Sequence, residues 1–511
     1  MFSLSSGNPY FLLYGSDFSN ESRGDSSPPS PAARSLLSGF YLTPSASRKV
    51  IGQVADCRML NYYMIFTACA CSGRCGRIFT VFLLRSACRG AEVGKDVDDS
   101  EHILHHTVGG GEGTDARKRV KGITWPVRHL AKDLGPRPPG SQAERSAARF
   151  IEKELKALGL EADIQDFRAP ATTAWSEMLV HLFPVIGAIS FNASSHLGYA
   201  LVCLGFLFFL LESYGRSPFS WLQPHRRSEN VVARIEPHRD AQRTVVIIAH
   251  MDSPRSAFYY RPGWIRLVRL AYLLDFACIA ALFMLFTVAY GGYLLSMEQD
   301  MLTLFWHLGL ILAIIPLLSL VALLFKAAAG KAIPGGNDNA SGISVLLELA
   351  RVYTRRQPHN TDLWLVSTGA SNAGGIGVRR LARRNRRELK GAFFILMDGV
   401  GRGFPVCYRR EGRLIPFRAN RKLTALVKRI SEVQAHYSAG FRRNCIYLSE
   451  GFYLLSRGRR AITISAREES RYPRYWRWNK DDFLNVDPRS LRLSLDFVVS
   501  MVDNIDRGEF K

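Results

Sequence analysis

Two apolar, β-rich runs constrain the fold of this chain more than any other feature of its sequence. Residues 244–250 read TVVIIAH and residues 392–398 read AFFILMD. Continuous apolar runs of this length, rich in β-branched and aromatic residues, are typical of buried parallel strands that helices cover on both faces. The sequence therefore predicts an α/β fold with a mostly parallel sheet flanked by helices.

Polar side chains stand at the carboxyl ends of both runs. His250 ends the first run, with Asp252 two residues further on, and Asp398 ends the second. Ligands of parallel α/β sheets bind beyond the carboxyl ends of the strands. We therefore expect these side chains to converge on one site.

The stretch from Pro334 to Arg351 adds another carboxylate to this group. It opens as a Gly-rich turn, and its later apolar residues recur at helical spacing. Asp338 lies in the turn, near the free N–H groups of the helix start, where a carboxylate is favoured. A helix cap with extra glycines would give the same turn without a ligand. One imidazole and two carboxylates, from His250, Asp338 and Asp398, suit zinc.

Several motifs together resemble the co-catalytic zinc aminopeptidases of metallopeptidase family twenty-eight, whose fold the glutaminyl cyclases share. The motifs are AHMDS at 249–253, GGNDNASG at 335–342 and LMDGVG at 396–401. LAKDLGPRPPGS at 130–141 and EGFYLLSRG at 450–458 extend the resemblance over residues 122 to 505, apart from apolar insertions. It implies a zinc-exopeptidase-like fold.

The resemblance also implies roles for individual residues. In the family, two metal ions about 3.5–4 Å apart share a bridging carboxylate and activate water between them. His250, Asp338 and Asp398 match the ligands of the first metal, with Asp338 as the bridge. Asp252 matches the carboxylate that orients the histidine ring.

The positions that serve the second metal depart from the family pattern. Where the family has Gly-Ala-Glu-Glu, with a general base followed by a metal ligand, residues 369–372 read GASN. Ser371 therefore takes the position of the base, and Asn372 that of the ligand. The last histidine corresponds to Trp478, or to Arg477 in a shifted alignment, and neither is a usual zinc ligand. We expect at most one zinc ion rather than two, and no confident catalytic residue.

Loss of a general base alone typically costs about 10²–10⁴ in rate. Other acids lie nearby in the sequence and are conceivable replacements, although no spacing favours one: Glu450, Glu468, Glu469, Asp481 and Asp482.

Composition divides the chain into unequal parts. Residues 1–119 begin with a Ser-, Pro- and Gly-rich stretch that buries little apolar surface, so we expect this region to be disordered. The expected zinc-exopeptidase-like domain spans residues 120–511.

Four apolar segments interrupt this domain: Leu179–Phe191, Leu197–Leu211, Leu270–Leu295 and Leu302–Phe325. The last two are long enough to cross a bilayer, and the first two are short for a full span. Buried core helices are the alternative, but a soluble sheet would not need two such apolar insertions. We therefore expect two transmembrane helical hairpins, at about 176–213 and 268–326.

Charge predicts an orientation for these segments. Lys and Arg residues flank the insertions on the domain side only: Arg216, Arg226, Arg227, Arg261, Arg266, Arg269, Lys326 and Lys331. Positive residues stay cytoplasmic, so we expect a multi-pass membrane protein whose α/β domain faces the cytosol.

A net charge of +23 favours anionic partners. Arginines crowd residues 379–387 and 457–477, which indicates either a solvated face near an anionic leaflet or a cleft for an acidic peptide or lipid headgroup. No recognisable nucleic-acid module accompanies them, so nucleic acid is not an expected partner.

These observations predict a membrane-embedded homologue of zinc aminopeptidases that is catalytically impaired or inactive and acts by binding. The alternative is an active metal-dependent exopeptidase, an aminopeptidase that hydrolyses peptides with substituted ligands. A third hypothesis is a basic scaffold at the membrane surface that binds no metal.

Overall fold

The computed structural model describes residues 13–15, 63–68, 79–84, 122–433, 440–468, 472 and 474–509. The chain forms two compact units, Met1–Thr107 and Val108–Lys511. In the first unit, β1 (Leu13–Gly15), β2 (Tyr63–Ala68) and β3 (Phe79–Leu84) form a three-stranded sheet in that order. Apart from these strands, the N-terminal region for which we predicted disorder lies outside the described residues.

The second unit is built on a nine-stranded sheet in which β6 lies between β8 and β7. The strand order is β10-β9-β12-β8-β6-β7-β5-β4, with β11 paired to β9. The strands are β4 (Ala162–Pro170), β5 (His225–Ile235), β6 (Arg243–His250), β7 (Thr361–Thr368), β8 (Phe393–Met397), β9 (Phe404–Glu411), β10 (Phe417–Arg418), β11 (Gly440–Asn444) and β12 (Arg460–Arg467).

The sheet is mixed, so the predicted mostly parallel sheet is correct only for its centre. β12, β8, β6 and β7 are parallel to their neighbours within this group. At one side of the sheet, β5 is antiparallel to both β7 and β4. At the other side, β9 is antiparallel to both β12 and β10. An apolar run does not encode strand direction, because direction depends on how each connection crosses the sheet.

Alternate residues of the central strands supply two hydrophobic cores, one on each face. Val245 and Ile247 pack with α4 (Gln142–Ala157), α9 (Ser341–Arg355), α11 (Arg421–Val433) and α13 (Pro488–Asp506). Val246 and Ile248 pack on the opposite face with α10 (Ile376–Arg384) and α12 (Glu450–Leu455). Both faces are therefore covered by helices, as the continuous apolar runs predict.

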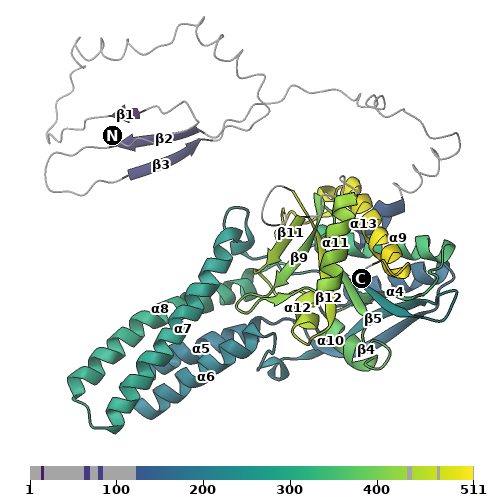
Figure 1. Cartoon of the computed structure of the whole chain (residues 1–511). Helices are drawn as coiled ribbons and strands as arrows, with labels where there is room; N and C mark the ends of the chain where they lie inside the picture. Colours follow the sequence, from purple (N-terminus) through teal and green to yellow (C-terminus); the bar gives the residue numbers. More distant parts are fainter. Residues whose placement is uncertain are drawn as a thin grey trace, which may run out of the picture. The chain divides into compact units, whose positions relative to one another are not determined.

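All four predicted apolar segments are helical. They form α5 (Ala174–Ser190), α6 (Ser195–Ser213), α7 (Ile265–Leu294) and α8 (Gln299–Ala329), which pack against one another and project from one end of the α/β part (Figure 1). By length and composition α6, α7 and α8 are able to span a membrane, and α5 is a shorter apolar helix. The first pair is inserted between β4 and β5, and the second follows β6 directly upstream of the Pro334 turn.

Candidate metal centre

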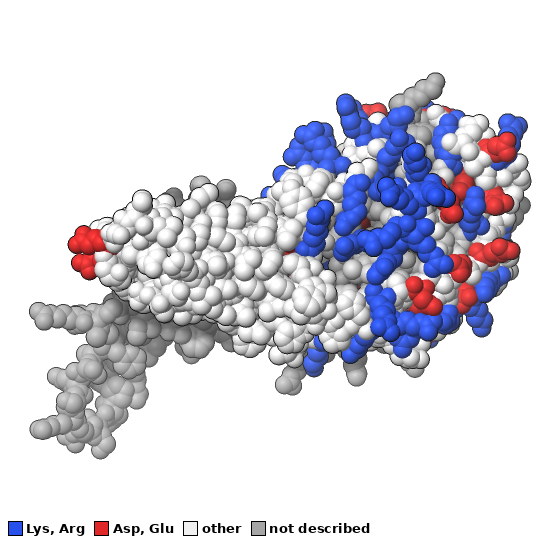
Figure 2. Space-filling view, turned by 90° about the horizontal axis from the view of Figure 1, so that it is seen from below, with Lys and Arg blue, Asp and Glu red and all other residues white. Residues whose placement is uncertain are grey.

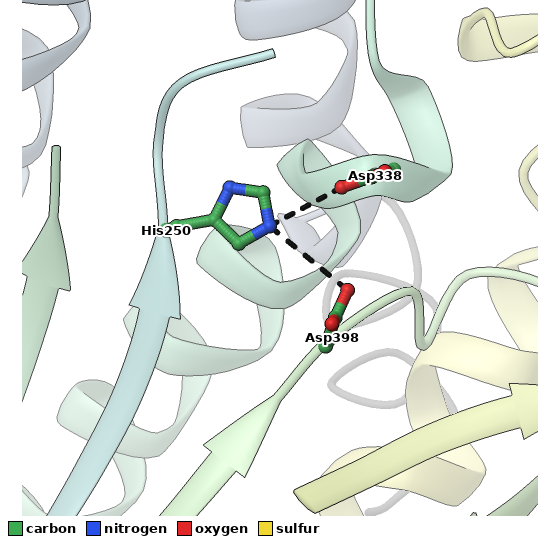
Figure 3. Close-up of side chains that lie close together, drawn as sticks. All are labelled: His250, Asp338 and Asp398. Atoms are coloured by element: carbon green, nitrogen blue, oxygen red, sulfur yellow. Dashed lines mark ion pairs between the residues drawn. The ribbon is translucent and has the colours of Figure 1, made fainter. Parts of the chain in front are cut away.

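Three of the residues predicted from the sequence lie together at the carboxyl edge of the sheet (Figure 3). His250 is the last residue of β6, and Asp398 directly follows β8, the parallel neighbour of β6. Asp338 lies in η5 (Gly336–Ala340), the turn that leads into α9. His250 Nε2 is 3.2 Å from Asp338 Oδ1 and 3.9 Å from Asp398 Oδ1.

This donor set fits one divalent cation. The three side chains are buried, and one possible ligand atom from each lies within 4.8 Å of the others. Asp338 presents its Oδ1 to His250 Nε2, and its Oδ2 lies on the side of Arg477. An imidazole nitrogen and carboxylate oxygens are usual ligands of zinc, so this buried group could bind a metal.

Asp252 holds the ring of His250 in position for such an ion. His250 Nδ1 is 3.0 Å from the carbonyl oxygen of Asp252 and 3.4 Å from its Oδ1, so Nε2 faces Asp338 and Asp398. Burial alone lowers the pKa of His250, but the neighbouring carboxylates of Asp252, Asp338 and Asp398 raise it well above its usual value.

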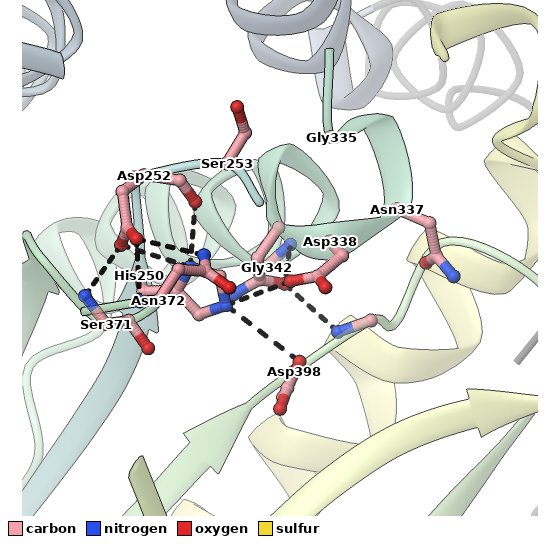
Figure 4. Close-up of polar contacts among 12 residues, drawn as sticks. His250, Asp252, Ser253, Gly335, Asn337, Asp338, Gly342, Ser371, Asn372 and Asp398 are labelled. Carbon is pink, nitrogen blue, oxygen red and sulfur yellow. Dashed lines mark hydrogen bonds and ion pairs between the residues drawn. The ribbon is translucent and has the colours of Figure 1, made fainter. Parts of the chain in front are cut away.

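The loop after β7 is anchored on the same aspartate (Figure 4). The backbone N–H of Ser371 donates to Asp252 Oδ1 at 2.9 Å. Asn372 donates to Asp252 Oδ2 through its backbone N–H at 2.8 Å and its side-chain amide at 2.9 Å. The loop thus places an uncharged hydroxyl and an uncharged amide where the resemblance implies two carboxylates.

Two of the nearby acids have structural partners. Asp481 accepts hydrogen bonds from the backbone N–H groups of Asn337 at 2.6 Å and Asp338 at 3.1 Å. Glu450 accepts one from Thr368 Oγ1 at 2.7 Å. Burial raises the pKa of both carboxyls to about 7. Asp481 therefore shapes the turn that carries Asp338.

Two further candidate acids have partners of their own. Glu468 forms ion pairs with Arg402 and Arg474, and Asp482 accepts a hydrogen bond from the backbone of Asn485. Glu469 lies outside the described residues. Within the part of the chain that the structure describes, the His250 group is the one cluster of three or more metal-capable side chains.

Arg477, one of the two residues that the resemblance aligns with the missing last histidine, lies beside Asp338 and Asn372. Its Nη2 donates to Asn372 Oδ1 at 2.8 Å, and its Nε is 3.7 Å from Asp338 Oδ2. Burial alone lowers the pKa of Arg477, but Tyr260 and Asp338 raise it above its ordinary value, so the side chain is charged. A fixed positive charge therefore lies beside Asp338, where it disfavours a further cation.

Sequence reasoning missed Arg137, which lies in the PRPPG segment and joins the loops that carry the site residues. Its buried guanidinium donates to the carbonyl oxygens of Met251 and Pro334, both at 2.9 Å. Burial lowers its pKa to about 10. The only local signal was an arginine among prolines and glycines, which does not indicate a buried side chain.

The asparagines of the GGNDNASG motif were also missed as positioning residues. Asn339 donates to the carbonyl of Met397 at 2.8 Å and accepts from the N–H of Gly399 at 3.0 Å. Tyr447 Oη donates to Asp398 Oδ2 at 2.6 Å. These bonds set the distance between the Asp338 and Asp398 loops. The motif itself was the signal, since paired amides in a turn often bind backbone groups.

A polar pocket adjoins the candidate metal centre. Its wall includes Ser371, Asn372 and Arg477 from the site region, and also residues of three apolar helices, Glu177 of α5, Glu212 of α6 and Lys326 of α8. Arg255 and Arg413 contribute two further positive charges. The pocket therefore connects the site to the base of the helical bundle.

Comparison with known proteins found a family similar to the part of the chain that carries Asp338 and Asp398. Residues 325–502 match the model of peptidase family M28. A search of curated proteins found no match.

Similar solved structures include an aminopeptidase from Aneurinibacillus sp. strain AM-1, with 16% identity over 75% of this chain and 93% of that chain and a TM-score of 0.44. A Bacteroides thetaiotaomicron glutaminyl cyclase is 14% identical over 75% of this chain and 97% of its own, with a TM-score of 0.45. The zinc aminopeptidase BSAP from Bacillus subtilis is 13% identical over 76% and 95%, with a TM-score of 0.46. The family match spans Asp338, Asp398 and the GASN loop, so the part of the chain that carries these residues is similar to peptidase family M28.

Proposed function

We propose that this protein is a membrane-embedded M28 homologue that binds one zinc ion and a ligand but does not hydrolyse peptides efficiently. The observation that carries this proposal is the loop of Ser371 and Asn372. Backbone hydrogen bonds to Asp252 anchor this loop, and its two uncharged side chains stand where the resemblance implies a base and a metal ligand. A serine hydroxyl does not accept a proton at neutral pH as a carboxylate does.

His250, Asp338 and Asp398 would hold the ion, and Asp252 would keep the histidine ring oriented. Zinc would supply a Lewis acid at this position. The rest of the site supports binding, because Arg477 and Tyr447 line the pocket with groups that can donate hydrogen bonds to a ligand.

The alternative is an active metal-dependent aminopeptidase, and metal content combined with turnover separates the two. We expect purified wild type to contain one zinc per chain and to show no hydrolysis of aminoacyl substrates. Asp338→Ala should lose the metal, whereas Asp163→Ala, a change at an exposed residue of β4, should keep it. If wild type hydrolyses these substrates and Asp338→Ala does not, the result would support the aminopeptidase. If wild type contains no metal, only the hypothesis of a basic scaffold would remain.

Membrane embedding is supported by the surface of the four helices. Large apolar side chains face outward along them, with Ile189, Met284 and Ile311 each at least 60% exposed. Figure 2 shows an almost uncharged surface over the bundle, basic side chains over the α/β part and acidic ones at the far tip. Lipid removes the cost of exposing such a surface to water.

Aromatic residues support the same proposal. Trp175, Trp221 and Trp264 are exposed near the ends of α5, α6 and α7 that adjoin the α/β part. Tryptophans concentrate at membrane–water boundaries, where their amphipathic rings meet the headgroups. Alkaline carbonate extraction of membranes tests the proposal: the protein should remain in the pellet, and release into the supernatant would exclude embedding.

We also propose that the pocket binds an acidic ligand, such as an acidic peptide. Four cations, Arg255, Lys326, Arg413 and Arg477, line it against two carboxylates, Glu177 and Glu212. Titration with a short oligoglutamate peptide tests this. Lys326→Gln should weaken binding about threefold to tenfold, and Lys428→Gln, at an exposed lysine outside this pocket, should not. Equal binding of an oligolysine peptide would contradict the charge argument.

A further inference from the structure

We propose that the guanidinium of Arg477 takes the place of a second metal ion, so that the centre consists of one ion and one arginine joined by Asp338. This inference rests on the single-metal site proposed above. It goes beyond that proposal because it names the group that replaces the missing cation. It also explains why the polar side chains around the second position still contact one another.

The carboxylate of Asp338 faces two ways. Its Oδ1 lies 3.2 Å from His250 Nε2, on the side of the candidate metal site. Its Oδ2 lies 3.7 Å from Arg477 Nε and accepts no hydrogen bond. Asp338 thus stands between the metal-binding group and a positive charge, as a bridging carboxylate stands between two ions.

Arg477 also engages the other residue at the altered positions. Its Nη2 donates to Asn372 Oδ1 at 2.8 Å, and Asn372 in turn donates to Asp252. Asp338, Asn372 and Arg477 therefore make one connected set. The resemblance implies ligands of a second ion at these positions. Here the side chains contact one another instead, through an ion pair between Arg477 and Asp338 and a hydrogen bond between Arg477 and Asn372.

The surroundings of Arg477 hold its guanidinium in a fixed place. Its central carbon lies 4.5 Å from the ring centre of Trp476, 5.4 Å from that of Tyr447 and 5.8 Å from that of Tyr260. Aromatic faces attract such a cation, more strongly where water is excluded. The backbone of Arg477 has a φ of 51°, in the left-handed region that non-glycine residues rarely adopt. Tertiary contacts, and not local preference, keep the side chain there.

At the positions of the second ion and its glutamate ligand, the exchange conserves charge. A divalent ion with one glutamate ligand contributes a net +1, and an arginine with an asparagine contributes the same. Ser371, where the resemblance implies a glutamate base, leaves the half-site one unit more positive. A guanidinium donates hydrogen bonds but does not lower the pKa of a bound water as a metal ion does. The exchange therefore keeps a cation beside Asp338 but removes the metal ion that would activate water for hydrolysis.

Metal stoichiometry tests the exchange directly. Wild type and variants are equilibrated with excess zinc, desalted and analysed for metal per folded chain. We expect one ion in wild type, two in the double variant Asn372→Glu/Arg477→His, and one in Asn372→Glu alone, whose new carboxylate pairs with Arg477. Arg474→His, which changes a more exposed arginine of the same segment, should stay at one.

A second measurement does not depend on rebuilding a site. Arg477→Met removes the positive charge near Asp338, so the zinc affinity of the remaining site should rise by about tenfold, whereas Arg477→Lys should leave it nearly unchanged. Melting curves confirm that each variant is folded.

The outcomes separate this inference from the proposed function. Wild type without zinc overturns the proposed metal centre itself. The role of Arg477 alone is overturned by three results together: wild type binds one ion, the folded double variant also binds one, and Arg477→Met leaves the zinc affinity unchanged. Two ions in wild type also overturn it, because the arginine would then not occupy the second position.

Discussion

Among single residues, Asp252 has the widest influence on the candidate site. It contacts His250 Nδ1 and accepts three hydrogen bonds from Ser371 and Asn372. Asp252→Asn retains the shape but removes the charge that orients and polarises the imidazole. We expect zinc affinity to fall by about 10–100-fold, as is usual for such outer ligand partners.

Competition with a chromophoric zinc chelator measures this affinity. Asp163→Asn, at an exposed position of β4, is the matched control and should bind zinc as wild type does. An unchanged affinity in Asp252→Asn would show that the carboxylate does not support the metal site.

A second prediction at this scale concerns Glu411, which is fully buried at the end of β9. It accepts hydrogen bonds from Thr463 Oγ1, at 2.8 Å, and from Ser449. Burial raises the pKa of its carboxyl from 4.5 to about 7. The folded chain therefore keeps a proton that the unfolded chain releases, and the free energy of unfolding falls as the pH rises from 4.5 to 7.

Glu411→Gln removes this titration. Relative to wild type, the variant should gain up to about 3 kcal/mol of stability between pH 4.5 and 7, from the shift of about 2.5 pKa units. Melting in detergent at pH 5 and pH 7.5 measures the difference. Glu236→Gln, at a side chain that is 75% exposed, should show no such trend. Parallel pH profiles of wild type and Glu411→Gln would refute the assignment.

At the scale of elements, the turn before α9 positions Asp338 through Gly335. Gly335 has a φ of 62°, and a Cβ there would lie 2.4 Å from the carbonyl oxygen of Asp338 and 2.7 Å from Ser253 Cβ. Gly335→Ala should cost more than the about 1–2 kcal/mol of a left-handed alanine, because the turn must also move. We expect a lower melting temperature and weaker zinc binding.

Gly159 offers the comparison, since it has a φ of 83° but open space around its Cβ position. Gly159→Ala should lower the melting temperature slightly and leave zinc binding unchanged. If both variants bound zinc equally well, the turn would not be the element that places Asp338.

The helical bundle has one buried polar contact between its two helix pairs. His181 Nε2 of α5 lies 2.5 Å from Asp275 Oδ2 of α7, and both side chains are buried. Asp275→Leu should destabilise the bundle by about 0.6–2 kcal/mol, because it leaves His181 without this partner among apolar helices. Melting in detergent tests this, with Met284→Leu at an outward-facing position as a neutral control.

At the scale of the whole molecule, charge predicts the side of the membrane on which the α/β part lies. Basic residues flank the helices at the end that adjoins the α/β part, and the turn between α7 and α8 contains Glu298 without Lys or Arg. We expect trypsin to digest the α/β part in sealed inside-out vesicles and to spare it in right-side-out vesicles. The reverse pattern would place this part outside the cytosol.

Much of this architecture was predictable from local patterns. Continuous apolar runs located β6, β8 and the four apolar helices, and the helical spacing of apolar residues located α9. The positions of His250 and Asp398 at strand ends indicated that they would meet, since adjacent parallel strands end at one edge of the sheet. The substitutions at Ser371 and Asn372 were likewise visible without coordinates.

Other features were decided by the tertiary structure. Three features depend on segments that lie far apart in the sequence: the antiparallel strands at the sheet edges, the buried hydrogen bonds of Arg137, and the approach of Arg477 to Asp338. Sequence aligned Trp478 with the last histidine, and Arg477 only in a shifted alignment, because the left-handed backbone at Arg477 is not a local preference of that residue. The sequence by itself indicated that His250, Asp338 and Asp398 would meet, and which two glutamates of the family pattern are replaced. Only the fold decided which cation stands beside Asp338, because charge acts through distances that long-range packing sets.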